Sequence, residues 1–424
     1  MAFSTSEYKT RLWRAMHLTE LMYPPPSKRR RSDFDNSQAS SPESSNTAST
    51  IGSPLGISVA TGYTPPGRLG AYRMEVGRDI RLDARLLTVL MNYGLHVART
   101  PTPLALLTPN SNLEEIRARI QEADRDIEGL CEHLPNTLPH DDLELQVEYR
   151  RETITGQKWN SIDLHIYGPV VKGGPLPCIL HCHGGGSIAS FRLNNKVYIR
   201  WCRSLAAQGM VVISVDYRDP IHSAEGLFPN GLNDICAAIV YVHSHHSTLN
   251  IKNIVLQGDA MGANLVLAAA IKAKQEGWSN KIDGVYAQSP MISNAYSWSE
   301  ARKLQELPSL LECHGYLVNV DYMAYAAHLY TSRSVDGTNP LAWPYHANRF
   351  ELQGLPPHVL ALDELDPLRS EGEAYLRKLV KAGVPAVGHV NLGTIHGASI
   401  IFRQAAPDLH RAAVRSVAAF AKQV

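Results

Sequence analysis

Short apolar runs that alternate with amphipathic segments form the main pattern of the last two-thirds of the chain. The runs are rich in Val and Ile, and the stretches between most of them place apolar residues at helical spacing. This pattern is typical of a mostly parallel sheet that helices cover on both faces. We therefore predict an α/β fold with strands at Leu143–Thr155, Ser161–Pro169, Leu176–Cys182, Met210–Val215, Ile251–Leu256, Ile282–Ala287, His358–Leu362 and Ala386–Val390.

Helical patterns also precede the first strand. They lie at Thr5–Met22, Asp79–Ala98 and Asn112–Leu134, and each presents one apolar face. Residues 24–66 are rich in Ser, Pro, Asn and Thr, which predicts a flexible segment. We expect residues 1–142 to form N-terminal cap helices around that segment and residues 143–424 to form the α/β domain. An aromatic-rich stretch at about 291–355 is too long for a plain connection, so we predict a cap insertion there.

Composition narrows the classes of function. A net charge of +1 gives no general field to attract nucleic acid or an anionic membrane. Charged residues interrupt the apolar N-terminus, unlike a signal peptide, and no later stretch is long and apolar enough to cross a bilayer. The six cysteines include no CxxC pair, which favours buried thiols in a reducing compartment. We expect a cytoplasmic protein with a small, weakly charged ligand and no nucleic-acid partner; homodimer formation stays open.

A glycine-rich loop, His183–Gly186, directly follows the predicted strand Leu176–Cys182. Glycines let the backbone approach a reacting carbonyl and present bare N–H groups to it, which describes an oxyanion hole. A phosphate cradle is the alternative, but no GK[ST] follows and the GxGxxG spacing is absent. The loop therefore favours acyl-group chemistry.

A second small-residue turn, Gly258-Asp259-Ala260-Met261-Gly262, closes an apolar strand and opens an Ala- and Leu-rich helix. In a nucleophile elbow of the G-x-S-x-G type, small flanking residues allow a tight strand-to-helix turn that presents the middle residue. Here the middle residue is Ala260, which has no atom to attack with. An ordinary tight turn between strand and helix is the alternative, because Gly-x-x-x-Gly is common.

Two further polar residues each follow a later predicted strand, and their order along the chain is informative. Asp366 stands just past one predicted strand and His396 just past the last. Nucleophile, acid and histidine follow one another in this order in α/β-hydrolases, where the histidine takes the proton of the nucleophile and the carboxylate orients the histidine. Taken alone, an Asp-Pro pair is usually a turn and a loop histidine is usually a surface residue. Their joint order favours a catalytic acid and base.

Residues from about 143 to 424 resemble the hormone-sensitive-lipase-like branch of α/β-hydrolases, a family of esterases. The matching stretches are HGGG at His183–Gly186, VDYR at Val215–Arg218, GDAMGA at Gly258–Ala263, DPLRSEG at Asp366–Gly372 and IHG at Ile395–Gly397. The resemblance implies hydrolysis of a carboxylic ester or lactone through an acyl-enzyme, and a cap built by the residues before 143. It places Ala260 on the nucleophilic serine and assigns the oxyanion donors, the acid and the base to Gly185, Gly186, Met261, Asp366 and His396.

The sequence departs from the family at the elbow and beside the pocket. Ala260 stands where the family has serine, Ala263 where it has glycine, and Asp219–His222 replaces the common Leu-Ala-Pro-Glu, which predicts an altered pocket rim. Either a serine was replaced at position 260, or the chain is a natural pseudoenzyme. Retention of the acid, the base and the glycine loop favours replacement, because these groups serve a transition state. We expect the chain to bind a ligand and barely react.

The remaining expectations concern ligands. We predict no cofactor and no metal, since the cluster His243, His245 and His246 lacks a Cys or carboxylate partner at ligand spacing. The aromatic insertion favours a bulky apolar ester or lactone as substrate. An acyltransferase or cyclase could use the same groups, and a ligand-binding receptor on an inactive hydrolase fold is the alternative from another class.

Overall fold

The computed structural model describes residues 64–97, 102–108, 110–135, 138, 146–170, 173–185 and 195–424. The predicted helix Thr5–Met22 lies outside these residues, as does the predicted flexible segment 24–66 except for its last three residues. Among the described residues, no helix combines the length and the apolar character needed to span a membrane.

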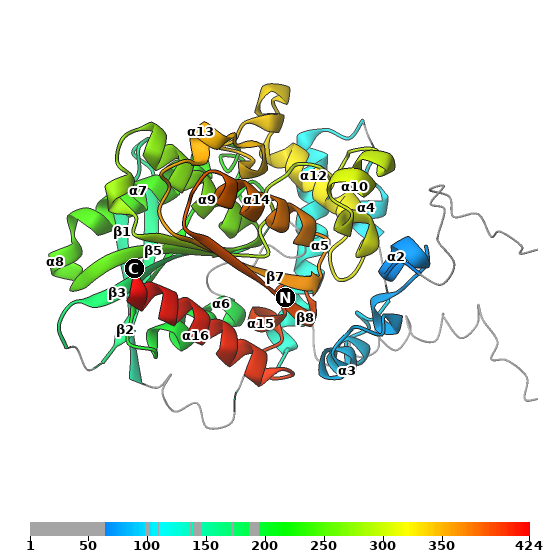
Figure 1. The fold of residues 1–424 in the computed structure, drawn as a ribbon, viewed down its shortest axis with the longest axis horizontal. Helices are drawn as coiled ribbons and strands as arrows, with labels where there is room; N and C mark the ends of the chain where they lie inside the picture. The colour runs from blue at the N-terminus through cyan, green and yellow to red at the C-terminus, as the bar shows by residue number, and fades with distance from the viewer. Residues whose placement is uncertain are drawn as a thin grey trace, which may run out of the picture. The chain divides into compact units, whose positions relative to one another are not determined.

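An eight-stranded sheet in the order β1-β2-β4-β3-β5-β6-β7-β8 forms the centre of the fold (Figure 1). β2 pairs antiparallel with β1 and β4, and every other pairing is parallel. The predicted α/β fold with a mostly parallel sheet is confirmed. The strands are β1 (Val147–Thr155), β2 (Ser161–Pro169), β3 (Leu176–Cys182), β4 (Val211–Asp216), β5 (Ile251–Asp259), β6 (Gly284–Gln288), β7 (His358–Leu365) and β8 (Ala386–Ile395).

Helices cover both faces of this sheet, as Figure 1 shows. Side chains alternate between two cores: on β5, Val255 packs into the core under one helical layer, and Leu256 packs into the other. Both faces are apolar because both are covered. One layer holds α6 (Lys196–Ala206), α15 (Ala398–Ile401) and α16 (Pro407–Gln423); the other holds α7 (Asn230–Ser244), α9 (Ala260–Gln275), α13 (Arg349–Leu352) and α14 (Arg369–Lys381).

Further helices lie between the strands and before the sheet. Between β6 and β7 lie α10 (Glu300–Glu306), α11 (Ser309–Glu312), α12 (Val320–Tyr330), η4 (Ser334–Thr338) and η5 (Pro344–His346). The remaining helical pieces are α2 (Gly67–Gly70), η1 (Val76–Arg78), α3 (Ala84–Asn92), α4 (Thr102–Ala105), α5 (Leu113–His133), α8 (His246–Leu249) and η3 (Ser279–Lys281).

Two of the N-terminal helices match the predicted helical patterns. The helix predicted at Asp79–Ala98 is shorter, because the Asp83 side chain caps it by accepting from the Arg85 amide at 2.8 Å and the helix ends just before Gly94. α5 packs on α12, where the Tyr322 hydroxyl donates to Asp124 at 3.1 Å. A segment before the sheet and a segment between β6 and β7 therefore share one small apolar core.

Candidate active site

The turn from β5 into α9 has the geometry of a nucleophile elbow. Ala260 has φ of 48°, in the left-handed region that a non-glycine residue rarely adopts. A Cβ on Gly258 would lie 2.4 Å from the backbone of Gly262, and a Cβ on Gly262 would lie 2.1 Å from the carbonyl oxygen of Cys182. The turn therefore requires glycine at both flanking positions, and its middle residue carries backbone strain of the kind that collects at functional sites.

The predicted acid and base meet at the ends of β7 and β8. His396 Nδ1 lies 2.8 Å from Asp366 Oδ2, and both side chains are buried. Asp366 is held in turn by the Leu368 amide, which donates to Oδ1 at 2.9 Å. The structure thus brings together two residues that the sequence separates by 30 positions.

Electrostatics around His396 favour its protonated form. Burial alone lowers the pKa of this histidine, but the charge and hydrogen bond of Asp366 outweigh it, with further contributions from Asp363 and Asp259, so that the pKa is raised. Asp259 directly precedes Ala260, so the negative charge of a residue in the elbow also raises the pKa of His396.

Asp363 is a second buried carboxylate beside the acid, and the sequence patterns did not single it out. It accepts from Thr394 Oγ1 at 2.6 Å, from Ser289 Oγ at 3.0 Å and from the Gly397 amide at 3.2 Å. Burial raises the pKa of Asp363, and the negative charge of Asp366 adds to this. A carboxylate that directly follows the apolar run Val359–Leu362 was the signal that could have identified it.

The glycine loop is tied to the elbow by a tyrosine that the motifs did not reveal. The Gly184 amide donates to the Tyr198 hydroxyl at 2.8 Å, and that hydroxyl donates to Asp259 Oδ2 at 2.6 Å. Burial raises the pKa of Asp259 to about 6. Tyr217, the residue after β4, supports the same loop, since its hydroxyl donates to the His183 carbonyl oxygen at 2.8 Å.

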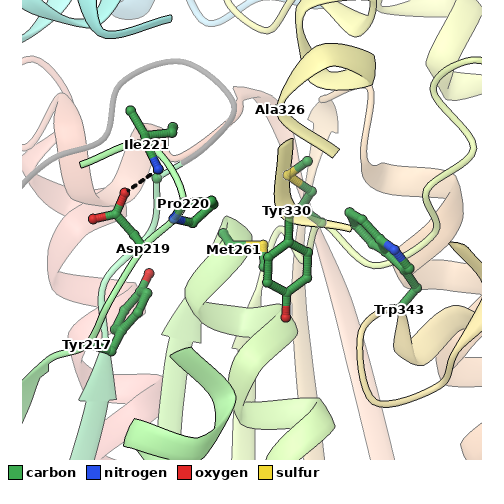
Figure 2. A pocket seen from close by; sticks show the side chains of 10 residues that line it. Tyr217, Asp219, Pro220, Ile221, Met261, Ala326, Tyr330 and Trp343 are labelled. Atoms are coloured by element: carbon green, nitrogen blue, oxygen red, sulfur yellow. Dashed lines mark hydrogen bonds between the residues drawn. The ribbon is translucent and has the colours of Figure 1, made fainter. Parts of the chain in front are cut away.

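A pocket of about 380 Å³, counting the part open to solvent, lies beside these elements (Figure 2). Two of the three predicted oxyanion donors, Gly185 and Met261, line it, whereas Gly186 lies outside the described residues. Three residues of the segment after Arg218, which we predicted to alter the pocket rim, line the pocket. The complete lining is Gly185, Tyr217, Asp219, Pro220, Ile221, Met261, Met291, Ala326, Tyr330 and Trp343.

His181 and the cluster His243, His245 and His246 lie on other elements than the predicted acid and base. His181 on β3 bonds to Gln257 at 2.7 Å, and burial lowers its pKa to about 3. His243, His245 and His246 lie at the junction of α7 and α8. In the part of the chain that the structure describes, no cluster of three or more His, Cys, Asp or Glu residues could hold a metal ion.

Comparisons with known proteins show what the chain is similar to. A family model for the α/β hydrolase fold matches residues 179–400. An arylesterase of Saccharolobus solfataricus is 29% identical over 242 residues, which cover 55% of this chain and 72% of that protein. The carboxylic ester hydrolase LipN of Mycobacterium tuberculosis is 30% identical over 363 residues, which cover 80% of this chain and 83% of that protein. Among solved structures, brefeldin A esterase, a bacterial homologue of human hormone sensitive lipase, matches with a TM-score of 0.81 at 39% identity, covering 85% of this chain and 98% of that one.

Proposed function

This chain belongs to the α/β-hydrolase fold family, as a carboxylesterase-type hydrolase of the hormone-sensitive-lipase-like branch, and from that premise we propose that its serine-bearing form hydrolyses carboxylic esters or lactones through an acyl-enzyme. The observation that carries the proposal is the buried 2.8 Å contact between His396 and Asp366, formed where two neighbouring strands end. Membership of the family supports ester hydrolysis as the class of reaction, and we propose the roles of the individual residues.

In this mechanism a hydroxyl at position 260 attacks the ester carbonyl. His396 removes the hydroxyl proton and passes it to the leaving alcohol, while Asp366 fixes the tautomer of the imidazole and stabilises its protonated form. Backbone amides of Gly185, Gly186 and Met261 stabilise the oxyanion of the tetrahedral intermediate. Water then attacks the acyl-enzyme, and His396 acts as base a second time.

We also propose that Ala260 replaces a serine. Positive φ at this residue costs free energy that an alanine side chain does not repay, whereas an attacking hydroxyl needs that position. The acid, the base and the glycine loop are all in place for a transition state that alanine cannot initiate. The chain as printed is therefore expected to bind esters and turn them over at a rate lower by about six orders of magnitude than the serine form.

Restoring the nucleophile tests the proposal directly. Ala260→Ser should hydrolyse p-nitrophenyl butyrate with a burst of p-nitrophenol, and the unchanged chain should not. Absence of both burst and turnover in a folded Ala260→Ser protein rejects the hydrolase. Addition of a competing alcohol separates hydrolysis from acyl transfer, because a transferase yields the new ester instead of the free acid.

A non-catalytic receptor is the second candidate, and Ala260 itself is the observation that favours it. The codon in the natural gene separates the two: an encoded alanine favours the receptor. The predominantly apolar pocket supports a small apolar ester or lactone as ligand in either case. Five described cysteines are buried free thiols, which supports a cytoplasmic location for the protein.

A further inference from the structure

The hydroxyl of Tyr330, the last residue of α12, is buried without a hydrogen-bond partner. Its side chain lines the pocket, and Figure 2 shows the ring among the pocket residues. A buried hydroxyl that lacks a partner is costly, so a ligand or water that pairs with it gains free energy. The combination of an unpaired hydroxyl with a place in the pocket lining distinguishes Tyr330 from the core tyrosines.

The other polar side chains of the pocket are already engaged. The Tyr217 hydroxyl donates to His183, the indole N–H of Trp343 donates to Thr331 Oγ1 at 3.1 Å, and Asp219 accepts from the amides of Ile221 and His222 at 2.9 Å each. Among the described lining residues, Tyr330 thus offers the one polar side-chain atom without a partner in the protein.

The Tyr330 ring is held in place by its neighbours. Trp343 contacts it edge to face, with ring centroids 5.5 Å apart, and Phe228 does so at 5.9 Å. The Phe228 amide also donates to the Tyr330 carbonyl oxygen at 3.0 Å. These contacts fix the ring in the wall of the pocket.

We propose that Tyr330 selects acyl groups that carry an oxygen beyond the ester carbonyl, such as a ketone, ether or hydroxyl. This inference rests on the proposed hydrolase function. The phenol donates a hydrogen bond to that oxygen, while Met261, Met291 and Trp343 contact the hydrocarbon part. A plain hydrocarbon chain fills the same space and leaves the phenol unpaired, and sites with a buried polar group discriminate against such ligands.

Matched substrates test the proposal in the Ala260→Ser protein. The probes are p-nitrophenyl heptanoate and its 4-oxo, 5-oxo and 6-oxo derivatives, each rate being divided by that of hydroxide-catalysed hydrolysis. At least one keto ester should be preferred in kcat/KM by roughly 3- to 10-fold, the worth of one net hydrogen bond. Adding Tyr330→Phe should bring that ratio close to one. Equal rates for all four esters, or a preference that survives Tyr330→Phe, would overturn the proposal.

Tyr375 on α14 provides the matched control, because its hydroxyl is also buried and unpaired but its side chain is not among the pocket lining. Tyr375→Phe should leave the keto preference unchanged, and a loss of preference in this variant would contradict a local role for Tyr330. The substrate series alone decides the matter if Tyr330→Phe does not fold. No turnover of any ester rejects the hydrolase itself, whereas turnover without keto preference rejects only this inference.

Discussion

The backbone amide of Gly397 donates a 3.2 Å hydrogen bond to the buried carboxylate of Asp363. Gly397 directly follows His396, so a second carboxylate, besides Asp366, holds the loop of the base. The base therefore lies in the field of more than one negative charge, which contributes to its raised pKa.

Asp363→Asn in the Ala260→Ser background should shift the acid limb of the pH–rate profile to lower pH. His396 must be neutral to act as base, and removal of a nearby negative charge lowers its pKa. The profile of kcat/KM for p-nitrophenyl butyrate measures this. Asp283→Asn, a change beside β5 where the carboxylate accepts from the Ile254 amide, serves as control and should leave the limb in place. An unmoved limb in Asp363→Asn would contradict the electrostatic role.

Tyr198→Phe in the same background should lower kcat by roughly 10- to 100-fold with a smaller effect on KM. The hydroxyl joins the Gly184 amide to Asp259, so its loss frees the glycine loop from the elbow and weakens oxyanion stabilisation. Steady-state kinetics provides the measurement. The matched control is Tyr149→Phe, which removes an exposed hydroxyl bonded to His165 on the sheet edge and should leave kcat unchanged.

Gly262→Ala should lower the free energy of unfolding by at least about 2 kcal/mol, because the new Cβ would lie 2.1 Å from a carbonyl oxygen of β3. Chemical denaturation monitored by circular dichroism measures the change. Gly168→Ala meets no atom within 4 Å and should be close to neutral. Equal stability of the two variants would argue against a tight elbow.

Glu371 should make the protein less stable as the pH rises from about 4.5 to about 8. Burial raises its pKa from 4.5 to about 8, so the folded state retains a proton that the unfolded state releases. The stabilisation is complete below the unfolded pKa and disappears as the pH rises through the folded value, and each unit of difference is worth about 1.4 kcal/mol. Denaturation curves across this range should show a smaller decline in Glu371→Gln. Glu373→Gln, on the same helix, should retain the full decline.

The sheet could be predicted because strands that are buried on both faces appear in the sequence as short apolar runs. β3, β5 and β7 read as apolar runs, and the elbow and glycine loop read as small residues at fixed spacing. The strand ends were less visible: β8 continues through Thr394 to Ile395, because pairing with β7 extends to the residue before His396. The local pattern of apolar residues therefore predicts which strands are buried better than it predicts the residue at which strand pairing ends.

The supporting residues were not predictable in the same way. Tyr198 and Asp363 act through partners 61 and 31 positions away, and nothing near them in the sequence indicates those contacts. Tyr330 is distinguished by a hydrogen bond that the protein does not make, which only coordinates reveal. The sequence therefore predicted the candidate reacting groups, and the structure was needed to find the residues that contact them.

β8 is the last strand of the sheet, paired on one side only, yet it leads directly to His396. The first half of β8 is largely exposed. Two hydrogen bonds of Gly393 hold the strand near its end. The Asp83 amide donates to the Gly393 carbonyl oxygen at 2.9 Å, and the Gly393 amide donates to Glu364 at 2.7 Å. Asp83, more than 300 positions upstream, thus helps to keep the end of this edge strand from fraying, and the His396 imidazole follows directly after that end.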